Sequence, residues 1–150
     1  MLSLTHTIVS LPFGIYLQNP TLIFVAAFLF HLLTDSLLHW NIHPKRHPRF
    51  PYKLVILDVI SGLGAAWLLL GDNIIAPAIV AAIAGGNAPD ILHSLWLLRS
   101  KTNPPPLWLT WVKPFFTFHH KIQRETDNIV RGLVFQIILV ALALTLILFR

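Results

Sequence analysis

The sequence predicts an all-α protein, a polytopic membrane helical bundle that takes up the whole chain as a single domain (residues 1–150). Of its residues, 55% are hydrophobic and only 11% are charged, and the mean hydropathy is +0.70. An average soluble domain carries about 25% charged residues. The apolar residues form five segments separated by proline, asparagine and basic clusters. A soluble fold of this size has too little interior for so much apolar surface, whereas a bilayer accommodates it.

The first three apolar segments are predicted to be membrane helices. The first covers residues 2–17, is short for a span, and ends at an Asn-Pro pair. The second covers residues 21–40. The loop that follows, residues 41–51, contains three prolines and cannot form one regular helix. The third covers residues 52–71, and an Asp-Asn pair predicts a tight turn after it.

The second half of the chain predicts two more helices and a segment at the membrane surface. Residues 74–98 form the fourth apolar segment, which we expect to be broken at residues 85–89, where the sequence is GGNAP. Residues 107–128 are rich in aromatic residues and predict an interfacial segment. The last helix, residues 129–149, is the clearest span, because about 20 apolar residues cross a bilayer.

The basic residues predict how these helices are oriented. The formal net charge is +5, and nearly all Lys and Arg fall on one side if the N-terminus is cytoplasmic and there are five spans. This distribution predicts an integral protein of the cytoplasmic (inner) membrane. The basic residues lie in short loops rather than on one folded face, so we expect no nucleic-acid partner. The chain has no cysteine, which excludes thiolate metal sites and cysteine nucleophiles.

Histidines and aspartates gather near the cytoplasmic ends of the predicted helices. With a rise of about 1.5 Å per residue, His31 is about 13 Å deep, Asp35 about 7 Å and Asp58 about 9 Å. An intramembrane carboxylate costs at least about 2.5–3.5 kcal/mol unless it is paired or hydrated. A shared metal ion is the simplest partner that offsets this cost.

The spacing of these residues supports a metal site. His31, Asp35 and His39 are four residues apart and are predicted to share one helical face, and Asp90 and His93 share another. One of the two adjacent histidines before the last span is expected to join them. The predicted metal ligands are His31, Asp35, His39, Asp90, His93 and one of His119 and His120. Imidazoles with carboxylates suit a divalent ion, zinc first, with manganese or iron as alternatives.

Simpler roles remain open for individual residues. His6 can be a packed or interfacial histidine, and His39, beside Trp40, can be solvated. His31 with Asp35 can be an intramembrane ion pair. Asp58 can pair with an arginine, and Asp90, directly after a proline, can be favoured simply by the dipole of a helix N-terminus.

Four short motifs resemble a known family. They are THT near the N-terminus, HLLTDSLLHW in the second helix, GNAPDILH in the fourth, and FHH before the last span. Together they resemble the bacterial membrane-bound metal-dependent hydrolases, inner-membrane proteins under SOS control. The pattern is distantly similar to that of zinc-dependent phospholipase C. This chain departs from the family by carrying Asp-x-x-His, at Asp90 and His93, in place of a second Asp two residues after Asp90.

The resemblance and the predicted ligands together imply a metal-dependent hydrolase that acts on a lipid-borne ester or phosphoester at the cytoplasmic face. Asp58 or His6 is expected to be a catalytic base or a further ligand. The cations expected to hold a phosphate head group are Arg46, Arg49, Lys121 and Arg124. The alternative functions are metal or ion transport, a membrane di-iron oxidase, and a purely structural metal site. A homodimer is a further possibility for so small a membrane bundle.

Overall fold

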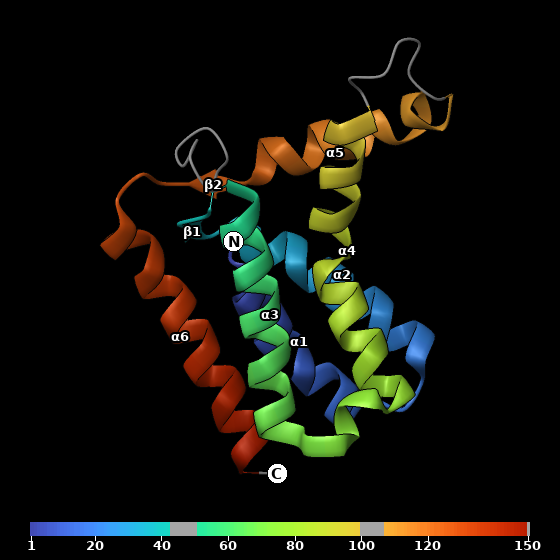
Figure 1. The fold of residues 1–150 in the computed structure, drawn as a ribbon. Helices are drawn as coiled ribbons and strands as arrows, with labels where there is room; N and C mark the ends of the chain where they lie inside the picture. The colour runs from blue at the N-terminus through green and yellow to red at the C-terminus, as the bar shows by residue number, and fades with distance from the viewer. Residues whose placement is uncertain (43–50, 100–106, 150) are drawn as a thin grey trace.

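The computed structural model describes residues 1–42, 51–99 and 107–149. Over these residues the protein is all-α, as predicted, with six α-helices, one short 3-10 helix (η1) and one pair of two-residue strands (Figure 1). The elements in order are α1 (Ser3–Tyr16), α2 (Pro20–Asp35), β1 (Leu38–His39), α3 (Pro51–Leu70), η1 (Gly71–Ile75), α4 (Pro77–Arg99), α5 (Trp108–Ile122), β2 (Arg124–Glu125) and α6 (Ile129–Leu148).

Helix α1 is the centre of the bundle. It packs against α2, α3, α4 and α6, and α2 also packs along α4. Most of its length is buried, including the apolar Ile8, Val9 and Leu11. The apolar core around it takes residues from α3, α4 and α6, namely Ala66, Leu70, Ile79, Ala143 and Ile147. A polar side chain on α1 is therefore surrounded by four other helices.

The predicted break in the fourth helix is wrong, because α4 is continuous from Pro77 to Arg99 with Pro89 inside it. A proline inside a helix crowds the carbonyl of the residue four positions earlier, here Gly85. Helix α4 nevertheless continues through Pro89. Two adjacent glycines let α4 approach its neighbours closely. A Cβ on Gly85 would overlap the Phe24 carbonyl, and one on Gly86 would overlap the side chain of Ser10. The glycines thus allow close packing of an intact helix rather than interrupting it.

The second helix ends earlier than predicted. Helix α2 stops at Asp35, and the Ser36 N–H is shared among the carbonyls of the preceding turn while the Ser36 hydroxyl donates to the Leu33 carbonyl. The chain then becomes extended as β1, which pairs in parallel with β2. His39 therefore lies on a strand, and the prediction that it shares a helical face with His31 is wrong.

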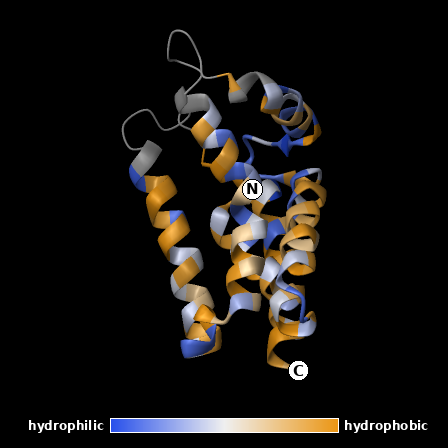
Figure 2. Cartoon of the chain, turned by 90° about the vertical axis from the view of Figure 1, so that its right-hand side faces the viewer, coloured by the Kyte–Doolittle hydropathy of each residue, from blue (hydrophilic) through white to orange (hydrophobic). Residues whose placement is uncertain are grey.

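Among the residues that the structure describes, two helices are long and apolar enough to cross a membrane, by length and composition. They cover Lys53–Ile75 and Ile129–Leu148, and only 17% of the apolar window of each is buried inside the protein. Their outer faces carry large apolar side chains such as Leu68, Ile137 and Leu148, and Figure 2 shows hydrophobic colouring along the outer helices. Helices α1 and α2, with 14 and 16 residues, are only about 21 and 24 Å long. This length is below the roughly 30 Å thickness of a bilayer core.

Different elements form the two ends of the bundle. Met1, β1 and β2 lie toward the end that α5 crosses, whereas η1 and the C-terminal end of α6 lie at the other (Figure 1). The end of α2, the start of α1 and α5 thus meet in one region.

Candidate metal centre

The carboxylate of Asp35 is surrounded by the Nε2 atoms of four histidines. Oδ1 lies 3.2 Å from Nε2 of His6 and 3.8 Å from Nε2 of His39. Oδ2 lies 3.3 Å from Nε2 of His31 and 3.2 Å from Nε2 of His119. All five side chains have no exposed surface. A buried carboxylate thus has imidazole nitrogens on both of its oxygens.

Four different elements deliver these groups. His6 comes from the second turn of α1, and His31 and Asp35 are one turn apart on α2. His39 comes from β1, and His119 comes from the last turn of α5. The β1–β2 pair places the chain after α5 beside the chain after α2. This pairing explains how His39 reaches the same carboxylate after the helix has ended.

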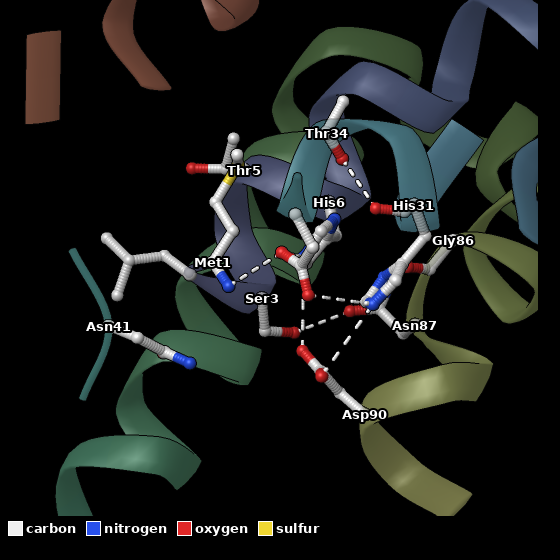
Figure 3. A network of polar contacts seen from close by, with 12 residues as sticks. Met1, Ser3, Thr5, His6, His31, Thr34, Asn41, Gly86, Asn87 and Asp90 are labelled. Atoms are coloured by element: carbon white, nitrogen blue, oxygen red, sulfur yellow. Dashed lines mark hydrogen bonds and ion pairs between the residues drawn. The ribbon is translucent and has the colours of Figure 1, made fainter. Parts of the chain in front are cut away.

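Asp90 of α4 supplies a second carboxylate. Its Oδ2 lies 3.9 Å from Nε2 of His6, and its Oδ1 lies 3.7 Å from Nε2 of His31. Figure 3 shows Met1, His6, His31 and Asp90 converging on this region. His6, His31, Asp35 and Asp90 each offer a ligand atom, and these four atoms lie within 4.8 Å of one another. Asp90 keeps 31% of its side chain exposed, so the centre is open on this side.

Hydrogen bonds from Nδ1 to backbone carbonyls set the tautomers of two of the imidazoles, His31 and His39. Nδ1 of His31 lies 2.7 Å from the Gly86 carbonyl, and Nδ1 of His39 lies 2.8 Å from the Leu37 carbonyl. A carbonyl only accepts hydrogen bonds, so each Nδ1 must carry the proton. Burial is the main effect that lowers the pKa of His39, which favours the neutral ring. In neutral His31 and His39, Nε2 then presents a lone pair to the Asp35 carboxylate, as in a metal ligand oriented by a backbone carbonyl.

Several ring nitrogens in the centre lack a hydrogen-bond partner. Both nitrogens of His6, Nε2 of His39 and Nδ1 of His119 are buried without one. The 3.2 Å contact between His6 and Asp35 is close but lacks hydrogen-bond geometry. His6 instead stacks on His31, with ring centroids 3.8 Å apart. An unpaired buried polar group costs about 1–3 kcal/mol, and a bound cation removes that cost for Nε2 of His6 and His39.

Two further groups contact Asp35. The Met1 amino group lies 2.9 Å from Oδ1, and Nε2 of Gln123 donates to Oδ2 at 3.0 Å. Gln123 follows α5 directly and is four residues after His119. The sequence analysis missed Gln123, although its i, i+4 spacing from a histidine was a usable signal.

Asp58 anchors the start of α1. Its two oxygens accept from the backbone N–H groups of Ser3 at 2.6 Å and Leu4 at 3.1 Å. No side chain of α1 itself caps that end, so Asp58 on α3 satisfies two N–H groups that a helix start leaves free. These are the contacts of a helix cap, and the predicted role as a base stays a prediction. Gln136 of α6 secures the same end, since its side-chain oxygen accepts from the Leu2 N–H and the Thr5 hydroxyl.

The remaining predicted site residues take other positions. His93 stacks on Phe116 with ring centroids 5.5 Å apart and meets His119 edge to face at 5.8 Å, so it borders the centre without belonging to the four-residue metal group. His120, next to buried His119, is exposed. Lys121 and Arg124 are also exposed, at the end of α5 and on β2. Arg46 and Arg49 fall outside the described residues.

Comparison with known proteins adds no relative. No family model matches the chain, and neither curated proteins nor solved structures give a match.

Proposed function

We propose that this protein is a membrane-embedded, metal-dependent hydrolase of a lipid-borne ester or phosphoester. The observation that carries the proposal is the convergence of His6, His31, Asp35 and Asp90 within 4.8 Å. Two histidines and two carboxylates are a donor set for zinc, with manganese and iron as alternatives.

The distances fit a metal ion better than a network of hydrogen bonds alone. Two ligand atoms held 2.0–2.1 Å from one tetrahedral ion lie about 3.4 Å apart. The contacts of His6 and His31 with Asp35 are 3.2 and 3.3 Å, and those with Asp90 are 3.9 and 3.7 Å. Without an ion, Nε2 of His6 stays buried and unpaired, which is unfavourable.

An open side favours catalysis over a structural role. Structural zinc sites are closed by four protein ligands, whereas catalytic sites keep a position for water or substrate. Here His6, His31 and Asp35 are fully buried and offer three ligands, whereas Asp90 is 31% exposed, which leaves room beside it for water or substrate on the ion. A bound divalent ion supplies a nucleophilic water at neutral pH and polarises a carbonyl or phosphoryl oxygen. Asp90 marks the side from which the substrate enters.

The surroundings of the site favour a lipid substrate. The outer faces of α3 and α6 are apolar, as expected for helices in contact with acyl chains. Helix α5, which carries His119, exposes the apolar Trp111 and Phe118 together with the cation Lys113. Such a helix suits the head-group region of a bilayer. We place the site at the cytoplasmic face, because the basic residues lie at this end of the predicted helices.

The test is a lipid-hydrolysis assay on the purified protein in mixed micelles. One set of micelles contains a phosphoester lipid and another a carboxylic ester lipid, with and without a chelator. We expect hydrolysis by the zinc-loaded protein, loss of activity with the chelator, and at least a 100-fold loss in His31→Gln, as for the removal of a group that acts directly in catalysis. His120→Gln, which changes an exposed histidine on α5, is the control and should stay active. A zinc-loaded, folded protein without activity on either lipid class would overturn the proposal.

The alternative function is ion transport, which can be tested with the same purified protein. Ions can pass through a bundle by way of buried polar side chains. Chelator-sensitive zinc flux in proteoliposomes, without hydrolysis, would replace the hydrolase proposal with a transporter.

A further inference from the structure

We infer that the centre binds two divalent ions bridged by the carboxylates of Asp35 and Asp90. This inference rests on the metal centre of the proposed function and goes beyond it in the number of ions and in the class of substrate. The starting observation is the way four histidines divide between the two oxygens of the Asp35 carboxylate.

The histidines divide in pairs between the two oxygens of Asp35. Nε2 of His6 and of His39 lie on Oδ1, at 3.2 and 3.8 Å. Nε2 of His31 and of His119 lie on Oδ2, at 3.3 and 3.2 Å. A carboxylate with imidazoles on both oxygens is placed to bridge two ions, one through each oxygen, and the ion on Oδ1 would displace the Met1 amino group that lies 2.9 Å from it.

Asp90 repeats the same division. Its Oδ2 is on the side of His6, at 3.9 Å, and its Oδ1 is on the side of His31, at 3.7 Å. The first ion would then have His6, His39 and one oxygen from each aspartate. The second would have His31, His119 and the other two oxygens. Each half supplies two nitrogens and two oxygens, a donor set for zinc, and a substrate oxygen would bind as a fifth ligand on the open side.

The separation of the two imidazoles in the second half agrees with this assignment. Nε2 of His31 and Nε2 of His119 lie 3.3 Å apart, which is close to the separation of about 3.4 Å for two ligands of one tetrahedral ion. A single ion among His6, His31, Asp35 and Asp90 would leave Nε2 of His39 buried and without a hydrogen-bond partner. A second ion gives this atom a partner, so two ions satisfy a nitrogen that one ion leaves unpaired.

Two ions also indicate the substrate. Two divalent cations carry four positive charges, and Asp35 and Asp90 neutralise two of them. The excess positive charge on the open side favours an anion, since charged groups attract strongly where water is excluded. Pairs of metal ions roughly 3.5–4 Å apart are also suited to clamping the oxygens of a phosphoryl group. The inferred substrate class is therefore a lipid phosphoester rather than a carboxylic ester.

The test counts ions and asks whether they share a bridge. Metal-free protein in detergent is saturated with Mn²⁺, separated from free ion by gel filtration, and measured by elemental analysis and electron paramagnetic resonance. We expect two ions per chain and a spectrum of two magnetically interacting Mn²⁺ ions. In His39→Gln we expect one ion per chain with the spectrum of isolated Mn²⁺. His120→Gln is the matched control: His120 is an exposed histidine next to His119, and this variant should keep both ions.

Several outcomes would overturn the inference. One is a single Mn²⁺ per chain in the saturated wild-type protein, and another is two ions without magnetic interaction. If His39→Gln does not fold, His119→Gln removes a ligand of the other half and should also leave one ion. One ion per chain with lipid hydrolysis would overturn this inference but support the proposed function. Two interacting ions without hydrolysis would support this inference but overturn the proposed function.

Discussion

His31 and His119 are 88 residues apart in the sequence, yet their Nε2 atoms lie 3.3 Å apart beside Oδ2 of Asp35. The contact joins α2 to α5, the helix that crosses one end of the bundle (Figure 1). Binding of an ion by both imidazoles would therefore stabilise the position of α5 as well as form part of the catalytic centre.

Removal of the metal should destabilise the protein. An ion that binds only the folded state at 100 times its Kd contributes about 2.7 kcal/mol, and for a chain of this size that corresponds to a shift of about 5–10 °C in Tm. Thermal unfolding in detergent, with zinc and after chelation, measures the shift. His31→Gln should have the lower Tm under both conditions. An identical Tm for the wild-type protein with and without zinc would argue against an ion at this position.

A side chain at position 86 should disturb the packing of α4 on α1 next to His31. A Cβ at this position would overlap the side chain of Ser10 and approach the His6 carbonyl. The Gly86 carbonyl also accepts a hydrogen bond from Nδ1 of His31. We expect Gly86→Ala to lose about 1–3 kcal/mol of unfolding free energy and to bind zinc more weakly. Gly64→Ala is the matched control, because a Cβ at Gly64 meets nothing within 4 Å. Equal stability of the two variants would contradict the close packing of α1 on α4.

Gln123 should position Asp35 without being a ligand. Its side-chain amide donates to Oδ2 at 3.0 Å, and loss of a group that orients a metal ligand typically weakens binding about 10–100-fold. We expect this loss in Gln123→Ala, with the same number of ions at saturation. Zinc titration by calorimetry provides the affinity. Gln18→Ala, at an exposed position, should bind as the wild type does, and an unchanged affinity in Gln123→Ala would remove Gln123 from the site.

Asp58 should contribute to the stability of the fold rather than to catalysis. It accepts from the N–H groups of Ser3 and Leu4, and loss of a helix cap costs about 0.5–2 kcal/mol. Asp58→Ala should therefore unfold at a lower temperature while keeping its activity per bound metal ion. Asp72→Ala, an exposed acidic change in η1, should alter neither property. A large fall in kcat at full metal occupancy would instead restore Asp58 as a base.

Sequence reasoning found much of the centre because the cost of burying charge is visible in the sequence. Asp35 and Asp90 stood out as carboxylates in apolar segments, and His31 lies one helical turn from Asp35. That reasoning does not depend on how the helices are arranged. The apolar segments also predicted the all-α class, although in the described part of the chain only two helices are long and apolar enough to be candidate spans.

The remaining details depended on contacts between distant segments. His39 reaches the centre from β1, which exists because it pairs with β2 more than 80 residues later. Gln123 is a neutral residue whose burial carries no such cost, so only its spacing of four residues from His119 marked it. The sequence GGNAP indicated a break, but close packing of Gly85 on Phe24 and of Gly86 on Ser10 accompanies an intact helix. Local patterns do not encode such long-range contacts.

Elemental analysis of the purified protein most directly tests whether Asp35 and its histidines bind a divalent metal. Wild-type protein, Asp35→Asn and His120→Gln are saturated with zinc, separated from free metal and measured side by side, with circular dichroism to verify helix content. The account predicts stoichiometric zinc in the wild type and in His120→Gln, and none in Asp35→Asn. A wild-type protein that folds but retains no zinc, or Asp35→Asn with the same zinc content as the wild type, would contradict it.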